Sequence, residues 1–361
     1  MPPNASQRLL RYRAGSAALD LLRREGLHAG NLGAIMGPAS GPKWLVLVGL
    51  DRALMASGLL DGEAQEAGRR PLLAGSSAGA WRMLTLASPD PATTHRGLLD
   101  GYVGQVFHRH DTPETISAAY RDMLRDLFPD EAIAHLVDHP RLDLGIHVAR
   151  VRGRLARRRS AQAVQLATAA AANLVSSRAM GWFFERMFLV ADPGRLPSDF
   201  RGGVARLGRD NLLPAARATG AVPIYLDSVD SIPGLRPGIY VDGGVTDYHL
   251  DQRYLDDDRL LLMPHYQRRV APSWFDKKLP RRTPRPAVAR NLLQVYPSEH
   301  FVAQLPGGRI PDRDEFTEYL DQPEERIRRW YEVAKLSERL GEDFLDDLES
   351  GRIADLVEPL E

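Results

Sequence analysis

The chain has no cysteine among its 361 residues. This absence excludes disulfide bonds, thiolate nucleophiles and cysteine-ligated metal sites. The chain also lacks a pair of histidines spaced as in H-E-x-x-H, the pattern that indicates a catalytic zinc site on a helix. We therefore expect no metal and no cofactor.

Long hydrophobic runs and an excess of one charge are absent as well. No apolar run approaches the ~20 residues needed to span a bilayer, and the N-terminus has no signal-peptide pattern; both observations predict a cytoplasmic protein. Lys plus Arg equals Asp plus Glu, 47 each, so no overall field favours nucleic acid as a partner. The charge is uneven, however: residues 267–290 carry eight basic residues against one acid, and the tail from Asp312 is acid-rich.

Predicted strands alternate with predicted helices along most of the chain. This alternation predicts an α/β protein with three α/β/α layers, a central, mostly parallel sheet and helical insertions. The N-terminus is expected to form an amphipathic helix over Ser6–Glu25. The expected organisation is an N-terminal helical segment 1–28, a catalytic domain 29–265 with a helical insertion at about 92–140 and apolar helices at about 160–190, a basic loop 266–290, and a last strand with a charged helical tail, 291–361, in the same unit.

Gly75-Ser76-Ser77-Ala78-Gly79 is a G-x-S-x-G pentapeptide. It follows an apolar run that predicts a strand and precedes a run that predicts a helix, which is the nucleophile-elbow pattern. Gly75 and Gly79 permit a sharp turn, and the positive N-terminal end of the helix favours an alkoxide or oxyanion near Ser77. An ordinary glycine-rich turn is the alternative.

A serine nucleophile needs a base, and Asp242 is the leading candidate. Tyr240 and Val241 end a predicted strand at Asp242-Gly243-Gly244, where little side-chain bulk intervenes. A plain Asp-Gly turn is the alternative interpretation. The third element is the segment Gly37–Gly41, which follows the first predicted strand and leads into a predicted helix from Trp44. Its backbone N–H groups could donate to an oxyanion; the alternative is a βα turn with prolines.

Along the chain come first the glycine-containing loop before a helix, then G-x-S-x-G, then D-G-G, and these three elements in that order resemble the patatin-like phospholipase family. A fourth element, residues 218–223, is similar to the small-residue, proline-ended segment that precedes the aspartate in that family. The resemblance covers about residues 30–250 and implies a patatin-like fold and hydrolysis of lipid carboxylic esters. It also implies that Ser77 is the nucleophile and that Asp242 is the general base without a histidine. The oxyanion hole implied by the same resemblance comprises Gly37, Ser40, Gly41, Pro42, Lys43 and Ala78.

The oxyanion loop departs from the family pattern of three glycines, any residue, a basic residue and a glycine. Gly41 takes the third glycine place and Lys43 takes the basic place. Ala39 and Ser40 replace the first two glycines, and Trp44 replaces the last. The sequence therefore leaves open which backbone groups donate to the oxyanion.

Two other functions remain open from the sequence. His249, His265 and His300 all follow Asp242, so an α/β-hydrolase esterase with a Ser-Asp-His triad is one alternative. The other is a non-catalytic lipid-binding protein, in which the altered oxyanion loop no longer supports turnover.

Two stretches bear on substrate access and on partners. The 160–190 region, which includes Trp182, either lines an acyl-chain channel or packs in the core. The basic loop 268–290, with Trp274 and Phe275, either contacts an anionic membrane surface or is a solvated loop. The expected partner is a lipid or a small ester substrate.

Overall fold

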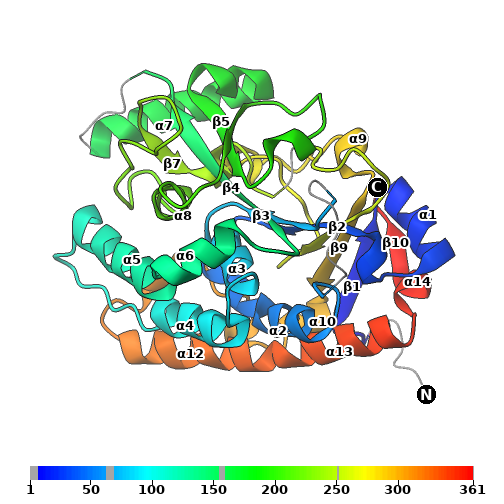
Figure 1. The fold of residues 1–361 in the computed structure, drawn as a ribbon. Coiled ribbons are helices and arrows are strands. Elements are labelled where there is room, and N and C mark those ends of the chain that lie inside the picture. The colour runs from blue at the N-terminus through cyan, green and yellow to red at the C-terminus, as the bar shows by residue number, and fades with distance from the viewer. Residues whose placement is uncertain (1–6, 62–68, 154–158, 250–251, 361) are drawn as a thin grey trace.

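The computed structural model describes residues 7–61, 69–153, 159–249 and 252–360. The strands of these residues form one ten-stranded sheet in the order β10-β1-β9-β8-β2-β3-β4-β5-β6, with β7 beside β4. Helices lie on both sides of the sheet (Figure 1), which confirms the predicted three-layer α/β/α class. The strands are β1 (Leu10–Ala14), β2 (Leu32–Gly37), β3 (Leu72–Gly75), β4 (Asp143–Val151), β5 (Phe184–Val190), β6 (Gly203–Arg206), β7 (Tyr240–Asp242), β8 (Leu260–Pro264), β9 (Leu292–Pro297) and β10 (Val357–Pro359).

Most neighbouring strands run parallel, as predicted. The exceptions are the pairs β1–β9, β4–β5 and β4–β7, which are antiparallel. Parallel strands covered on both faces are apolar along their whole length. β2 fits this rule, because every one of its residues is buried.

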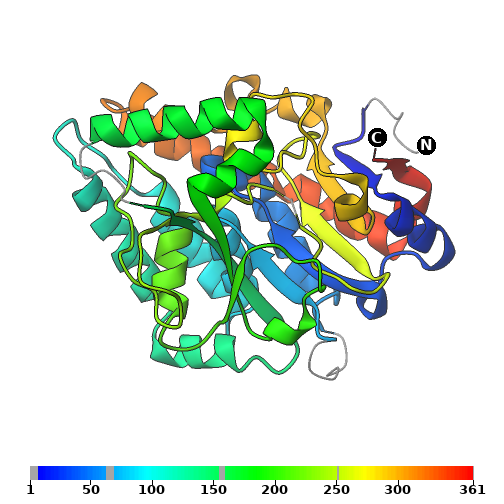
Figure 2. The ribbon, with the colours of Figure 1, turned by 90° about the horizontal axis from the view of Figure 1, so that it is seen from above.

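The helices cover the sheet in two layers (Figure 1). α2, α3, α4, α12 and α13 pack on one side around the largest hydrophobic cluster. α7 lies on the opposite side, at the end of the molecule away from the blue α1 in Figure 2, and shares a hydrophobic cluster with residues of β4, β5 and β7. The helices are α1 (Ser16–Glu25), α2 (Val48–Ala56), α3 (Ala78–Leu86), α4 (Pro91–Val103), α5 (Pro113–Leu127), α6 (Asp130–Val137), α7 (Arg159–Val175), α8 (Leu212–Thr219), α9 (Pro286–Ala289), α10 (Glu299–Val302), α11 (Glu315–Glu318), α12 (Pro323–Leu336), α13 (Glu338–Glu349) and α14 (Ile353–Leu356).

The helical insertion predicted at about 92–140 consists of α4, α5 and α6. Its longest helix, α5, begins where the sequence indicates a start. Thr112 accepts the Thr115 amide, the Thr115 side chain accepts the Thr112 amide, and Pro113 occupies the first helical position. This capping box satisfies amides that have no partner within the helix.

The predicted N-terminal helix, Ser6–Glu25, is wrong in its first half. Leu10–Ala14 forms strand β1 between β9 and β10, and the helix α1 begins only at Ser16. Leucine and alanine content favours a helix here, but Leu10, Tyr12 and Ala14 are apolar at alternate positions. That spacing of two is the pattern of a strand.

The predicted apolar helices over 160–190 are correct only for α7. Phe184–Val190 forms strand β5, which pairs antiparallel with β4 along seven residues of that strand, Gly145–Val151. Aromatic and β-branched residues favour strands when a partner edge is available, and the long strand β4 provides that edge. The charged tail is helical as predicted, but it also adds strand β10 to the sheet.

None of the helices in the described ranges has the length and apolar character needed to cross a bilayer.

Candidate functional site

The carboxyl ends of β3 and β7 meet head to head on one edge of β4. β3 runs parallel to β4 and ends with Gly75 opposite Ile146, whereas β7 runs antiparallel and ends with Asp242 opposite Val148. β5 occupies the other edge of β4. Along this edge of β4, only His147 separates the residue paired with the end of β3 from the residue paired with the end of β7. The turn that follows β3 and the turn that follows β7 are therefore brought together.

Close backbone contact between three glycines shapes the turn that presents Ser77. A Cβ on Gly37 would lie 2.2 Å from the carbonyl oxygen of Gly79, and a Cβ on Gly75 would lie 2.5 Å from that of Gly37. Gly243 is constrained in the same way, because its Cβ would lie 2.2 Å from a carbonyl oxygen of β4. The glycines of both motifs therefore let the two turns pack directly on neighbouring backbone.

Ser77 has a strained backbone conformation at the N-terminus of α3, with φ 55° and ψ −137°. A positive φ is uncommon for residues other than glycine, and such strain concentrates at functional sites. Ser77 is 8 % exposed and lines a cavity. The hydroxyl of Ser76 is directed elsewhere, because it donates to the carbonyl oxygen of Asp247 at 2.7 Å. Of the two adjacent serines, Ser77 is the one that faces the cavity.

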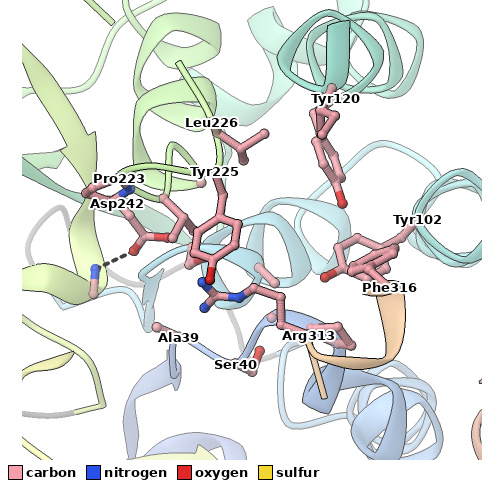
Figure 3. Close-up of a pocket in the computed structure, with 18 of the residues that line it drawn as sticks. Ala39, Ser40, Tyr102, Tyr120, Pro223, Tyr225, Leu226, Asp242, Arg313 and Phe316 are labelled. Carbon is pink, nitrogen blue, oxygen red and sulfur yellow. Dashed lines mark hydrogen bonds between the residues drawn. The ribbon is translucent and has the colours of Figure 1, made fainter. Parts of the chain in front are cut away.

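The carboxyl of Asp242 lies beside the Ser77 hydroxyl and is buried. Its Oδ1 accepts the Gly244 amide at 2.7 Å, the bond drawn as a dashed line in Figure 3. Burial raises the pKa of Asp242 to about 6, against the lowering effects of hydrogen bonds from Ser77 and Gly244 and of the charges on Arg313 and Lys277. A carboxyl group with this pKa can accept a proton near neutral pH.

The segment that precedes β7 holds both members of the pair. The Ser77 amide donates to Thr219 Oγ1 at 2.9 Å, and the Asp242 amide donates to the Ala221 carbonyl oxygen at 3.0 Å. This is the small-residue, proline-ended segment noted in the sequence. Thr219 is a positioning residue that the sequence pattern did not single out.

Three free amide donors lie at the cavity, two in the loop after β2 and one at the N-terminus of α3. The amides of Ser40, Gly41 and Ala78 have no hydrogen-bond partner within the described ranges, and all three residues line the cavity. Gly41 needs its glycine because its φ is 54°. The Ser40 hydroxyl is buried and likewise has no partner there.

The other three predicted oxyanion residues do not supply such a donor. Gly37 lies inside β2 and does not line the cavity. Pro42 has no amide hydrogen. The Lys43 amide is already bonded to the Ser40 carbonyl oxygen at 3.3 Å, and its ammonium group pairs with Asp312. The lysine therefore ties the loop to the segment that follows β9.

The cavity has a volume of about 260 Å³ and a mostly apolar, aromatic wall (Figure 3). Ser77 and Asp242 lie together in one part of this wall. The rest of the wall comes from several elements: the loop 39–42, Ala78 and Trp81 of α3, helices α4 and α5 with the loop between them, residues 220–226 and 244–248, Trp274, and residues 313–320.

A buried ion pair fixes the helix that follows Ser77. Arg82 of α3 donates to both carboxylate oxygens of Asp51 of α2, at 2.7 and 2.6 Å. His95 of α4 contacts the same carboxylate at 3.1 Å. Burial opposes the charge of Asp51, but Arg82 outweighs it and holds the pKa of Asp51 below its usual value. The carboxylate of Asp51 therefore links α2, α3 and α4.

The histidines considered for a triad are not brought to this site. His249 Nε2 contacts the Tyr266 hydroxyl at 2.8 Å, and its Nδ1 accepts the Ala271 amide at 2.9 Å. His265 is buried away from the cavity, and His300 is exposed on α10. No carboxylate–histidine contact of a triad involves these residues within the described ranges.

The aromatic residues of the 160–190 region do not form an acyl channel. Phe184 and Phe188 pack in hydrophobic clusters, and Trp182 is 76 % exposed. None of these rings lines the cavity. In the basic loop, Trp274 lines the cavity and Phe275 packs near Phe184, so neither ring of that loop is fully exposed.

Several wall residues were not identified from the sequence. Arg313 and Phe316 come from the charged segment after β9, where the composition indicates only a solvated helix. Tyr225 follows Ile224, whose φ of 76° is unusual for a β-branched residue. The one sequence signal that could have identified these wall residues is the presence of two aromatic residues, Tyr225 and Phe316, within otherwise polar or turn-like sequence.

Comparison with known protein families finds no matching family, and comparison with curated proteins finds no match. The geometry of the site and its sequence motifs therefore carry the functional argument.

Proposed function

We propose that the protein is a serine acyl hydrolase that cleaves carboxylic esters of lipids. The observation that carries this proposal is the placement of Ser77 and the buried Asp242 together in the wall of an apolar cavity, where the Ser77 side chain is one of the groups that lower the pKa of Asp242. A nucleophile and a base side by side, with amide donors at the same cavity, are the parts that acyl transfer requires.

In the proposed mechanism, Asp242 takes the hydroxyl proton as Ser77 Oγ attacks the ester carbonyl carbon. The resulting oxyanion accepts hydrogen bonds from the free amides of Ser40, Gly41 and Ala78. The tetrahedral intermediate then expels the alcohol, which receives the proton from Asp242. A water molecule repeats these steps on the acyl-enzyme: Asp242 takes its proton, the acid is released, and Ser77 Oγ recovers its hydrogen.

We also propose that the chain is related to the patatin-like phospholipases. Support comes from the order of the four motifs and from the absence of a histidine at the Ser77–Asp242 pair within the described ranges. The altered glycines of the loop do not remove its donors, because the amides of Ser40 and Gly41 are free.

Cytoplasmic localisation and peripheral contact with an anionic membrane through 268–290 belong to this proposal. The exposed side chains of Lys277, Lys278 and Arg281 support the contact, because cationic groups at a surface attract anionic lipid headgroups.

Fluorophosphonate labelling followed by peptide mapping tests the proposed nucleophile. We expect the label on Ser77 and none on the Ser77→Ala variant, with hydrolysis of p-nitrophenyl esters reduced at least about a thousandfold in that variant. Ser76→Ala is the matched control, since the Ser76 hydroxyl is bonded to the Asp247 carbonyl; it should still be labelled. Correctly folded protein without label would favour a lipid-binding role instead.

A further inference from the structure

Charge is scarce in the wall of the cavity. The lining residues with a carboxylate, imidazole or guanidinium side chain are His108, Asp111, Asp242 and Arg313. Asp111 is engaged in the turn before α5, where its carboxylate accepts the His108 amide at 2.7 Å. Apart from the proposed base and this carboxylate, Arg313 is therefore the principal fixed charge that a bound substrate meets.

Arg313 has no carboxylate partner within the described ranges. Its guanidinium lies 5.1 Å from the centre of the Tyr225 ring. Two of the acids near it in sequence are engaged elsewhere: Asp312 pairs with Lys43, and Glu315 accepts the Trp330 indole N–H at 2.6 Å. The third, Asp314, is exposed and forms no ion pair with Arg313 in the described ranges. Figure 3 shows the side chain reaching from the Phe316 side of the cavity toward Asp242.

A second cation lies near the same site. The ammonium group of Lys277 lies 5.3 Å from the centre of the Tyr248 ring, and Tyr248 lines the cavity. Lys277 also has no ion-pair partner in the part of the chain that the structure describes. Both Lys277 and Arg313 act on Asp242 by lowering its pKa, so their field reaches the reacting groups.

This arrangement suits an anionic ligand. The guanidinium of Arg313 contacts an aromatic ring and pairs with no carboxylate of the described residues, so its N–H groups are available. The edge of a guanidinium matches a carboxylate or a phosphate with two parallel hydrogen bonds. In a largely apolar wall such bonds are less screened than in water. The aromatic remainder of the wall suits a hydrocarbon chain.

We propose that the cavity selects esters that carry a carboxylate or phosphate near the scissile bond, and that Arg313 binds this anion with Lys277 adding to the field. The inference rests on the proposed acyl hydrolase function. It assigns Arg313 a role in substrate specificity rather than in the chemical step.

The test uses three decanoyl esters that differ in charge: 1-decanoylglycerol, its 3-phosphate, and the decanoyl ester of glycerate. We expect the full-length protein to prefer the two anionic esters. Arg313→Gln should raise KM for both by at least about tenfold, the usual value of a lost charge-assisted hydrogen bond, and leave the neutral ester within about twofold. If the site recognises a phosphate, Arg313→Gln should raise KM more for the 3-phosphate; if it recognises a carboxylate, the larger rise should be for the ester of glycerate.

Two matched controls accompany this variant. Arg329→Gln removes a similar cation–π contact, with Tyr319, outside the cavity wall, and should leave all three esters unchanged. Lys277→Ala should raise KM for the anionic esters by a few fold, whereas Lys335→Ala, at an exposed position of α12 outside the cavity wall, should not. An equal loss on neutral and anionic esters in Arg313→Gln would overturn the proposal.

Binding without turnover separates the two proposals. Calorimetry on the Ser77→Ala protein compares decyl phosphate with the neutral ether 1-decylglycerol. Tighter binding of decyl phosphate that is lost in the Ser77→Ala/Arg313→Gln double variant supports anion recognition even if no ester is hydrolysed. Equal binding of the two amphiphiles would reject anion recognition, whatever the outcome of fluorophosphonate labelling.

Discussion

Burial of Asp242 raises its pKa, which suits the proposed role as a base but lowers the stability of the folded protein at neutral pH. Its pKa is raised to about 6 in the folded protein, whereas the ordinary value is 3.8. The folded state therefore keeps a proton between about pH 4 and pH 6 that the unfolded chain has released. Stability contributed by this group is present below about pH 4 and is lost as the pH rises through about 6.

Replacing Asp242 with Asn should separate these two effects. The amide oxygen can still accept the Gly244 amide, but the base is gone, so ester hydrolysis should fall by about a hundredfold or more. At pH 7 the variant should be more stable than the parent by on the order of 2–3 kcal/mol, because a buried charge is removed. Urea unfolding measured at pH 4 and pH 7 checks this, and the gain should disappear at pH 4.

The parent protein should show the titration of Asp242, the proposed base, in the pH profile of its ester hydrolysis. Because Asp242 acts as a base only when deprotonated, kcat/KM should fall as the pH drops below about 6. A profile that stays flat down to pH 4 would contradict the assignment of Asp242 as the base.

Among the elements, α2 is the one that connects the elbow helix to the C-terminal tail. On one side Asp51 pairs with Arg82 of α3. On the other side the Gly49 amide donates to Ser337 Oγ at 3.0 Å, and a Cβ on Gly341 of α13 would lie 2.3 Å from the Gly49 carbonyl oxygen. A change in α2 therefore affects both the helix that carries Ser77 and the packing of the tail.

Asp51→Ala should destabilise the protein by about 3–5 kcal/mol, because it leaves the guanidinium of Arg82 buried without its partner. The adjacent Arg52 provides a matched control, since it pairs with Glu338 at the surface and its replacement by alanine should cost less than about 1 kcal/mol. Urea unfolding measures both. Similar losses in the two variants would mean that the buried pair does not hold these helices together.

The centre of the site is predictable from sequence because its parts are local. Strand, glycine turn and helix are contiguous around Ser77, and strand and turn are contiguous around Asp242. Arg313 is not predictable in this way, because its place in the wall depends on how the segment after β9 folds back over the insertion helices. The strand Leu10–Ala14 is missed for a related reason: its partners β9 and β10 lie about 280 and 345 residues further along the chain.

At the scale of the whole molecule, the N-terminal and C-terminal segments pair with each other in the sheet. β1 lies between β9 and β10, so an N-terminal strand separates two strands of the C-terminal part. α12 and α13 cover α2 and α4 (Figure 1), and the fully buried Trp330 of α12 stacks on Tyr102, which lines the cavity. The charged tail thus contributes to the core, to the sheet and to the site.

Two C-terminal truncations should consequently behave differently. A chain ending at Leu356 loses only β10, a three-residue strand at the edge of the sheet, and should remain folded, active and modestly less stable. A chain ending at Gln322 also loses α12, α13 and α14, which exposes the apolar faces of α2 and α4 and removes Trp330 from Tyr102. It should be recovered mostly as insoluble protein. Soluble yield, urea unfolding and ester hydrolysis of the two chains measure the difference. A soluble, active chain ending at Gln322 would show that the tail is dispensable for both the core and the cavity.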